Sequence, residues 1–112
     1  MRIYLSGPMS GLPDFNYPAF HTTAALLRHV GYCVMNPAET GVRPDWAYAD
    51  YLRHDLQILL AQAEGVATLP GWRTSRGARL EVTVAEMLGL PIAPVITWLR
   101  RAGRPDAQTK GC

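Results

Sequence analysis

The chain has 112 residues, of which 48% are hydrophobic and 18% charged, so it is long enough for one globular domain and too short for two. No apolar run approaches the length of about 18 residues that a transmembrane helix needs. The net charge of +2 divides into −1 over residues 1–96 (seven basic and eight acidic side chains) and +3 over residues 97–112 (four basic and one acidic). The folded part therefore lacks the basic surface that a duplex-binding domain carries.

Four predicted strands alternate with three predicted helices. Each strand is a short run of mostly apolar residues, and each helix repeats apolar residues at intervals of three and four. In chain order we expect a strand at 2–6, a helix at 16–30, a strand at 32–35, a helix at 46–63, a strand at 65–69, a helix at 76–88 and a strand at 91–96.

The later strands are continuously apolar rather than alternating, which is typical of parallel strands that helices cover on both faces. The sequence therefore predicts a small Rossmann- or flavodoxin-like α/β sandwich of three layers, with a mainly parallel sheet of four to five strands. Pro94 suits an edge strand better than a central one. Ligands of such sheets bind at the carboxyl ends of the strands, so the loops at 7–15, 36–45 and 70–76 are the ones expected to form a site.

The two ends of the chain support a cytoplasmic protein with one folded unit. The first strand leads at once into a Ser/Gly/Pro-rich loop, which leaves no room for the apolar region of a signal peptide. Residues 1–96 form the predicted domain, and residues 97–112, which are basic and rich in polar residues, Gly and Pro, form a predicted flexible tail. Two cysteines, Cys33 and Cys112, are too few for a disulfide framework or a metal set.

Several common sites are missing from the sequence. No G-x-G-x-x-G follows the first strand, and the segment from Gly7 to Gly11 lacks the Lys-Ser/Thr of a P-loop, which argues against a dinucleotide oxidoreductase and an NTPase. The three histidines share no metal-ligand spacing, and Cys33 in an apolar strand is most simply a small core residue. We expect neither a metal nor a cofactor.

Two acidic residues lie on the apolar faces of predicted helices. Glu81 belongs to a stripe that should face the sheet, and Asp55 lies between Leu52 and Leu59. The stripe around Glu81 consists of Ala78, Glu81, Val82, Ala85 and Leu88. A buried acid costs several kcal/mol unless it is paired or hydrogen-bonded.

Two such acids on consecutive helices could converge on one pocket. A structural explanation is also open, in which Asp55 pairs with Arg53 or His54 and Glu81 pairs with Arg79 or with a helix N-terminus. Adjacent helix residues do not face one another, which weakens these pairings.

Further candidate site residues flank the two acids. The small residues from Ser75 to Ala78 would let a ligand approach the backbone N–H groups that open the third helix, and Arg73 and Arg76 could add charge for a phosphate. Tyr4, near the end of the first strand, either fills the core or reaches a catalytic carboxylate. Trp72 is a base-stacking platform, a lid or a buried loop anchor.

Four segments together resemble the nucleoside 2-deoxyribosyltransferase-like superfamily, and most closely its short, uncharacterised branch found in phages and bacteria. They begin at Ile3 (Ile-Tyr-Leu-Ser-Gly-Pro-Met), Asn36 (Asn-Pro-Ala-Glu), Leu69 (Leu-Pro-Gly-Trp) and Ser75 (Ser-Arg-Gly-Ala-Arg-Leu-Glu). The resemblance covers residues 2–95, approximately the whole predicted domain.

The resemblance implies a set of roles for the candidate residues. Glu81 would be the nucleophile that attacks C1′ of a 2′-deoxyribose, Asp55 would help the base to leave, and Tyr4 would orient the nucleophile. Ser6 and Ser75 would bind a 5′-phosphate, with Gly7 and Gly77 allowing close backbone approach. It also implies a homodimer or larger homo-oligomer, and, for a phage protein, action in the host cytoplasm.

We therefore expect an enzyme that cleaves or exchanges the N-glycosidic bond of a 2′-deoxynucleoside or its 5′-monophosphate. Its partner would be this small molecule rather than duplex nucleic acid or a membrane. The alternative is a module that binds or sequesters a nucleotide in the same pocket without turnover. A flavodoxin-like redox protein is a third possibility, disfavoured because the first loop lacks a Ser/Thr-rich phosphate site of flavin type.

Overall fold

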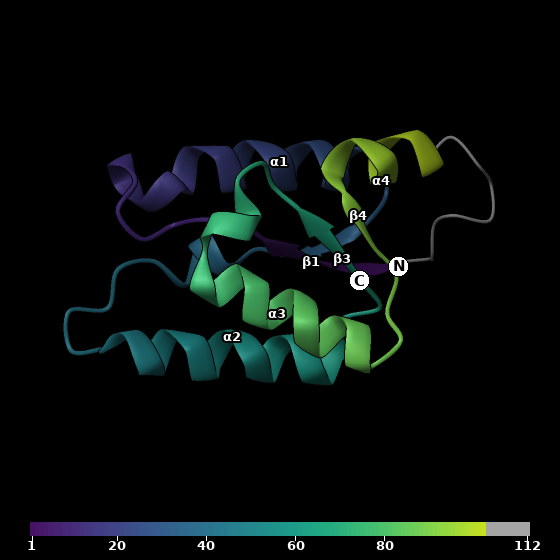
Figure 1. Cartoon of the computed structure of the whole chain (residues 1–112). Helices are drawn as coiled ribbons and strands as arrows, with labels where there is room; N and C mark the ends of the chain where they lie inside the picture. Colours follow the sequence, from purple (N-terminus) through teal and green to yellow (C-terminus); the bar gives the residue numbers. More distant parts are fainter. Residues whose placement is uncertain (103–112) are drawn as a thin grey trace.

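The computed structural model describes residues 1–102, and residues 103–112 lie outside its description. Its elements follow the predicted alternation of strands and helices (Figure 1). The strands are β1 (Arg2–Ser6), β2 (Cys33–Met35), β3 (Gly65–Thr68) and β4 (Ile92–Pro94), and the α-helices are α1 (Tyr17–His29), α2 (Tyr48–Gln62), α3 (Arg76–Met87) and α4 (Val95–Arg101). Three short 3-10 helices lie in the loops: η1 (Pro13–Asn16), η2 (Pro37–Thr40) and η3 (Trp72–Thr74).

The four strands form one sheet in the order β2-β1-β3-β4, and every pairing is parallel. The predicted Rossmann- or flavodoxin-like α/β sandwich with a parallel sheet is thereby confirmed. β4 lies at an edge of the sheet and ends at Pro94, where the missing N–H of proline is tolerated, as predicted. β2 lies on one side of β1, whereas β3 and β4 lie on the other side. The order in which strands are added to the sheet therefore changes direction at the boundary between β1 and β3, which is the topological switch point.

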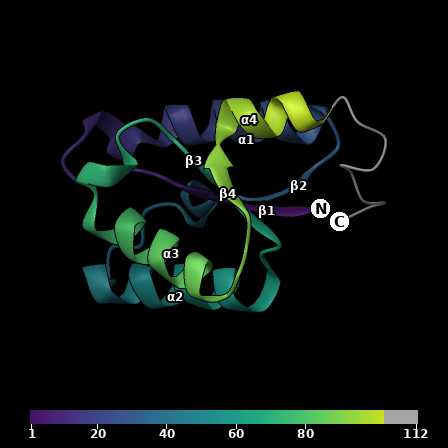
Figure 2. The same ribbon diagram turned by 45° about the vertical axis from the view of Figure 1, so that its right-hand side comes forward.

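Helices cover both faces of the sheet. Figures 1 and 2 show α1 and α4 against one face and α2 and α3 against the other. Side chains of β1 alternate between the faces: Ile3 and Leu5 belong to the core beneath α1 and α4, whereas Tyr4 belongs to the core beneath α2 and α3. Ser6 shares the face of Tyr4, and this shared direction decides the geometry of the site.

The chain beyond β4 differs from its prediction. The strand expected at 91–96 ends at Pro94, and the following helix α4 includes the first residues of the predicted tail. Trp98 of α4 is buried, its indole N–H donates to the carbonyl of Val66 at 3.0 Å, and its ring meets Tyr32 edge-on at 5.9 Å. The prediction of a flexible tail from residue 97 is therefore wrong for residues 97–102, because one tryptophan gives this short segment an apolar anchor. The rest of the predicted tail lies outside the described residues.

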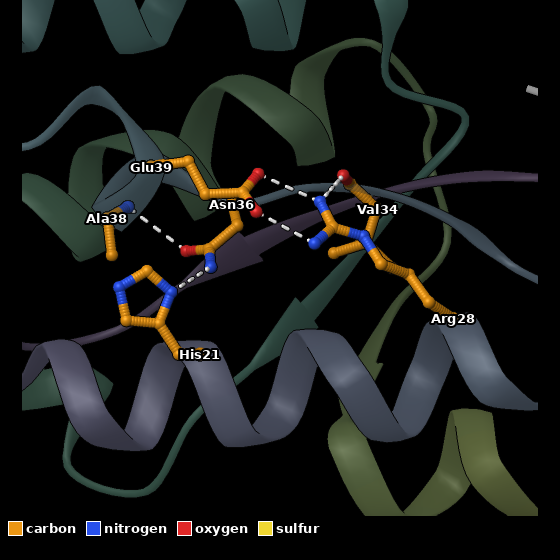
Figure 3. A network of polar contacts seen from close by, with 6 residues as sticks. All are labelled: His21, Arg28, Val34, Asn36, Ala38 and Glu39. Carbon is orange, nitrogen blue, oxygen red and sulfur yellow. Dashed lines mark hydrogen bonds and ion pairs between the residues drawn. The ribbon is translucent and has the colours of Figure 1, made fainter.

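A polar network fastens the loop after β2 to α1 (Figure 3). The guanidinium of Arg28 donates to both carboxylate oxygens of Glu39 at 2.8 Å and to the carbonyl of Val34 at 2.8 Å. This pairing raises the pKa of Arg28 and lowers that of Glu39. Asn36 accepts from the N–H of Ala38, which caps η2. The Asn-Pro-Ala-Glu segment thus holds the 36–45 loop in place.

The stripe predicted on α3 is confirmed for Ala78, Glu81, Val82 and Ala85, all of which are buried. Leu88 is half exposed, because the helix ends at Met87 and the chain turns away at Gly89. No helix within residues 1–102 combines the length and apolarity that crossing a membrane would require.

Candidate functional site

A cavity of about 300 Å³ opens at the carboxyl ends of β1 and β3, at the topological switch point of the sheet. Its wall combines the three loops that the sequence singled out with one face each of α2 and α3. The lining residues are Leu5, Gly7, Met9, Ser10, Phe15, Tyr17, Phe20, Pro37, Val42, Tyr48, Tyr51, Leu52, Asp55, Ser75, Gly77, Ala78 and Glu81. Most of these are apolar or aromatic, and the two acids are the charged groups among them.

Glu81 lies in the second turn of α3 and points towards β1. Helix α3 begins after Ser75, whose side chain accepts from the N–H of Ala78 at 3.2 Å and caps the helix. Glu81 is only 6% exposed, and both of its carboxylate oxygens accept hydrogen bonds. The Tyr4 hydroxyl donates to Oε2 at 2.6 Å, and the Ser6 hydroxyl donates to Oε1 at 2.8 Å.

The two donors are brought together by the alternation of β1. Residues two apart on a strand point to the same face, so Tyr4 and Ser6 reach one carboxylate side by side. Burial, together with the negative charges of Glu81 and Asp55, raises the pKa of Tyr4 well above its usual value. Tyr4 therefore keeps its proton and remains a donor across the physiological range.

Asp55 reaches the same cavity from α2, so the two acids share one space as the sequence suggested. Burial and, less strongly, the charge of Glu81 raise the pKa of Asp55 to about 7. Burial also raises the pKa of Glu81 to about 7, although the hydrogen bonds from Tyr4 and Ser6 act in the opposite direction. Each carboxylate makes ionisation of the other harder.

Glu81 and Asp55 differ in their hydrogen bonds, and this difference favours the negative charge on one of them. Glu81 accepts from two buried hydroxyl groups, whereas no hydrogen bond to the Asp55 side chain is found among residues 1–102. When one proton is shared by the pair, the two hydroxyl donors favour the charge on Glu81 and the proton on Asp55. This is the arrangement of a nucleophile beside a general acid.

Asp55 also borders a second, more polar cavity of about 440 Å³. Tyr4, Asn36, Thr40, Arg43 and His54 are among its lining residues. Because Asp55 lines both cavities, it can exchange protons with solvent on the side away from Glu81.

Four aromatic residues that are at least partly exposed line the first cavity and form an aromatic rim: Phe15, Tyr17, Tyr48 and Tyr51. Phe15 lies in η1, where Asp14, Phe15 and Asn16 all have positive φ angles of 51°, 53° and 59°. Left-handed backbone costs about 1 kcal/mol or more per residue that is not glycine, so the surrounding structure must hold this turn in place. The side-chain amide of Asn16 contributes by donating to the carbonyl of Pro8 at 3.0 Å. Phe15 lies 5.7 Å from the ring of Tyr17, and both line the cavity.

Sequence reasoning missed this rim. Phe15, Tyr17, Tyr48 and Tyr51 are single aromatic residues in a loop or in the first turns of helices, where no periodic pattern marks them. Only the convergence of η1, α1 and α2 in space makes them neighbours.

The remaining predicted residues divide into two groups. Gly7, Ser75 and Gly77 line the cavity with Glu81 and Asp55, whereas Ser6, Trp72 and Arg76 do not. Ser6 is fully buried behind Glu81. Trp72 is half-buried in η3 beneath the guanidinium of Arg73, 4.7 Å from its ring centre, and Arg76 is exposed at the start of α3.

Within the described residues, no three His, Cys, Asp or Glu side chains lie close enough together to hold a metal ion. What the site offers is acid–base and nucleophilic chemistry by two carboxyl groups in an apolar, aromatic-rimmed cavity.

The family described as "Domain of unknown function (DUF4406)" matches residues 1–94. The match includes all four strands, the cavity and both acids, and the chain therefore belongs to the DUF4406 family. No curated protein matches the chain.

Proposed function

We propose that this DUF4406 protein cleaves or exchanges the N-glycosidic bond of a 2′-deoxynucleoside or its 5′-monophosphate, and that it belongs to the nucleoside 2-deoxyribosyltransferase-like superfamily that its sequence resembles. The observation that carries the proposal is the pair of acids facing one cavity, with Glu81 held by two hydroxyl donors and Asp55 held by none from residues 1–102.

In the first step, a Glu81 carboxylate oxygen forms a bond to C1′ while the bond between C1′ and the base nitrogen breaks. The electron pair of that bond leaves with the base, and the proton of Asp55 neutralises it. In the second step, water or another base attacks C1′, the ester to Glu81 breaks, and Asp55 takes up the proton that the attacking group releases. Two displacements at C1′ give net retention, as in retaining glycosidases.

The lining of the cavity suits a nucleoside. A planar base fits an apolar space rimmed by Phe15, Tyr17 and Tyr51, because aromatic faces stack on one another. Ser75 and Gly77 lie where α3 presents free N–H groups, which favours an anionic group such as a 5′-phosphate. We therefore propose the nucleotide over the nucleoside. The burial of Ser6 makes it a partner of Glu81 rather than a phosphate ligand.

A base-release screen tests the proposal. The protein is incubated with each deoxynucleoside monophosphate, with the corresponding ribonucleotides, and with deoxynucleosides, and free base is measured by chromatography. We expect base release from at least one deoxynucleotide, abolished in Glu81→Ala and retained in Glu86→Ala, which changes an exposed glutamate of the same helix. Tight nucleotide binding without base release, unchanged in Glu81→Ala, would instead assign the cavity to a binding module.

We also propose that the chain acts as a homodimer or larger homo-oligomer. Apolar side chains that remain exposed along α3, namely Leu80 and Met87, support a covered surface there, since Met87 is 84% exposed in the single chain. Sedimentation analysis of the wild-type protein and of Met87→Glu tests this, and a wild-type monomer at micromolar concentration contradicts it.

A further inference from the structure

We propose that Ser6 is a positioning residue that designates Oε1 of Glu81 as the oxygen that attacks C1′, while Tyr4 holds Oε2 as the oxygen that becomes the ester carbonyl. The inference rests on the proposed glycosyl transfer to Glu81. It starts from a difference between the two hydroxyl groups that bind the carboxylate.

Ser6 has a second acceptor within reach. Its hydroxyl lies 2.8 Å from Oε1 of Glu81 and 3.4 Å from the carbonyl oxygen of Ala78, one turn earlier in α3. A serine hydroxyl carries a single proton and rotates to suit its surroundings, so it donates to one of these oxygens at a time. The short contact to a charged oxygen is favoured while Glu81 is ionised.

Tyr4 has no such alternative. Its hydroxyl donates to Oε2 of Glu81 at 2.6 Å, and no second acceptor for it is found in residues 1–102. Tyr4 is only 1% exposed and its ring packs on the sheet with Leu59 and Ala85, so its hydroxyl has little access to solvent. Tyr4 therefore needs an acceptor at the Oε2 position in every state of the enzyme.

Formation of the glycosyl ester makes the two carboxylate oxygens different. The oxygen bonded to C1′ loses its charge and becomes a weak acceptor, whereas the other oxygen becomes a carbonyl and still accepts. If Oε1 bonds to C1′, Ser6 turns its proton to Ala78 and Tyr4 keeps its bond to the carbonyl, so neither hydroxyl is left without an acceptor. If Oε2 bonded to C1′, the buried Tyr4 hydroxyl would lose its acceptor, which costs about 1–3 kcal/mol.

The same rotation assists the second step. When water attacks C1′, the bond between C1′ and Oε1 breaks, both of its electrons stay on Oε1, and the attacking water gives its proton to Asp55. Ser6 then turns back from Ala78 and donates to the charge that develops on Oε1. Ser6 therefore stabilises the departing carboxylate, and its loss should slow breakdown of the ester more than formation of the ester.

The test compares Ser6→Ala with Tyr4→Phe, using the deoxynucleotide from which the wild type releases base. The matched control is Thr68→Val, which removes another buried hydroxyl at the strand position paired with Ser6. Intact-protein mass spectrometry during turnover measures the fraction of glycosylated enzyme, and steady-state kinetics give kcat and KM separately.

We expect Ser6→Ala to accumulate the glycosyl-enzyme, with kcat and KM both falling about tenfold or more. At a pH alkaline enough to ionise Glu81 in both proteins, kcat/KM should stay close to the wild-type value, because this ratio reports the first step. Its acid limb should move to higher pH, since Glu81 has lost a donor that lowers its pKa. Thr68→Val should show none of these changes, and Ser6→Cys, with a weaker donor, should lie between wild type and Ser6→Ala.

Each other outcome overturns the inference in a recognisable way. Accumulation of the ester in Tyr4→Phe but not in Ser6→Ala would assign the attack to Oε2. A fall in kcat with unchanged KM in both Ser6→Ala and Thr68→Val would reduce Ser6 to a packing residue. A wild-type protein that releases no base and forms no adduct refutes the proposed function itself, and the inference with it.

Discussion

Replacing Glu81 with glutamine is expected to stabilise the protein at alkaline pH and to leave it nearly unchanged at pH 4. Glutamine has almost the same shape as glutamate, so the variant keeps the packing of α3 on β1. Its amide oxygen accepts from Tyr4, and its amide nitrogen donates to Ser6, whose own proton then turns to the carbonyl of Ala78. The variant therefore removes the buried charge without leaving a hydroxyl unsatisfied.

The magnitude follows from the raised pKa of Glu81. Burial moves this pKa from 4.5 to about 7. A carboxyl group that binds its proton more tightly in the folded state supports folding fully below pH 4.5, and this support is lost as the pH rises through 7. At about 1.4 kcal/mol for each pH unit, ionised Glu81 lowers the free energy of unfolding by about 3 kcal/mol at pH 8.

Thermal and urea unfolding of Glu81→Gln and wild type at pH 4, 6 and 8 measure this effect. The melting temperature of the variant should exceed that of the wild type by roughly 10 °C at pH 8 and by little at pH 4. Glu86→Gln, on the exposed side of the same helix, should show no such trend. Equal stability of the two proteins at pH 8, or a difference that does not vary with pH, would refute the conclusion that Glu81 is a buried carboxyl group whose ionisation opposes folding.

Three further predictions concern other parts of the molecule. Trp98→Ala should lower the free energy of unfolding in urea by about 3–5 kcal/mol, because it empties a buried site and removes the indole N–H that donates to the Val66 carbonyl; no loss would mean that α4 does not belong to the fold. Base release should peak near pH 7, since it needs a charged nucleophile and a protonated Asp55, and in Asp55→Asn it should fall at least a hundredfold and lose its alkaline decline. Gly77→Ala brings a Cβ within 2.9 Å of the exposed Tyr48 hydroxyl, so the free energy of unfolding should change by less than about 1 kcal/mol while KM for the substrate rises several-fold. An unchanged KM would mean that the substrate binds elsewhere.

The fold could be predicted because its signals are local and repeat. A spacing of three and four residues located the first three helices, and one alternating segment followed by three continuously apolar runs located the four strands. The continuous runs also indicated parallel pairing. The same patterns placed Glu81 and Asp55 on buried faces, because an acid within an apolar stripe stands out without any knowledge of the structure. The shared cavity then follows from the parallel order, which puts the helices after β2 and β3 on one face of the sheet.

The parts that could not be predicted depend on single side chains and long-range contacts. Ser6 beside a Gly-Pro loop is compatible with a phosphate ligand or with a buried donor, and only the approach of α3 decides for the donor. Helix α4 depends on Trp98, which packs against Tyr32 more than sixty residues earlier in the chain. The left-handed turn from Asp14 to Asn16 contains no glycine, so no residue in the sequence indicates it.

Burying Glu81 and Asp55 lowers the stability of the fold, and this loss of stability helps to decide between a catalyst and a binding module. A pocket that only binds a nucleotide needs apolar walls and a few polar groups at its surface, and a buried glutamate that opposes folding above neutral pH adds nothing to such recognition. At this site, β1 instead supplies Tyr4 and Ser6 as donors to one carboxylate, and α2 supplies a second carboxyl group whose pKa burial raises to about 7. An apolar residue at position 81 would pack on β1 without that penalty. These features support the proposed turnover over sequestration, since an ionised oxygen beside a protonated acid is the arrangement that making and breaking a glycosidic bond needs.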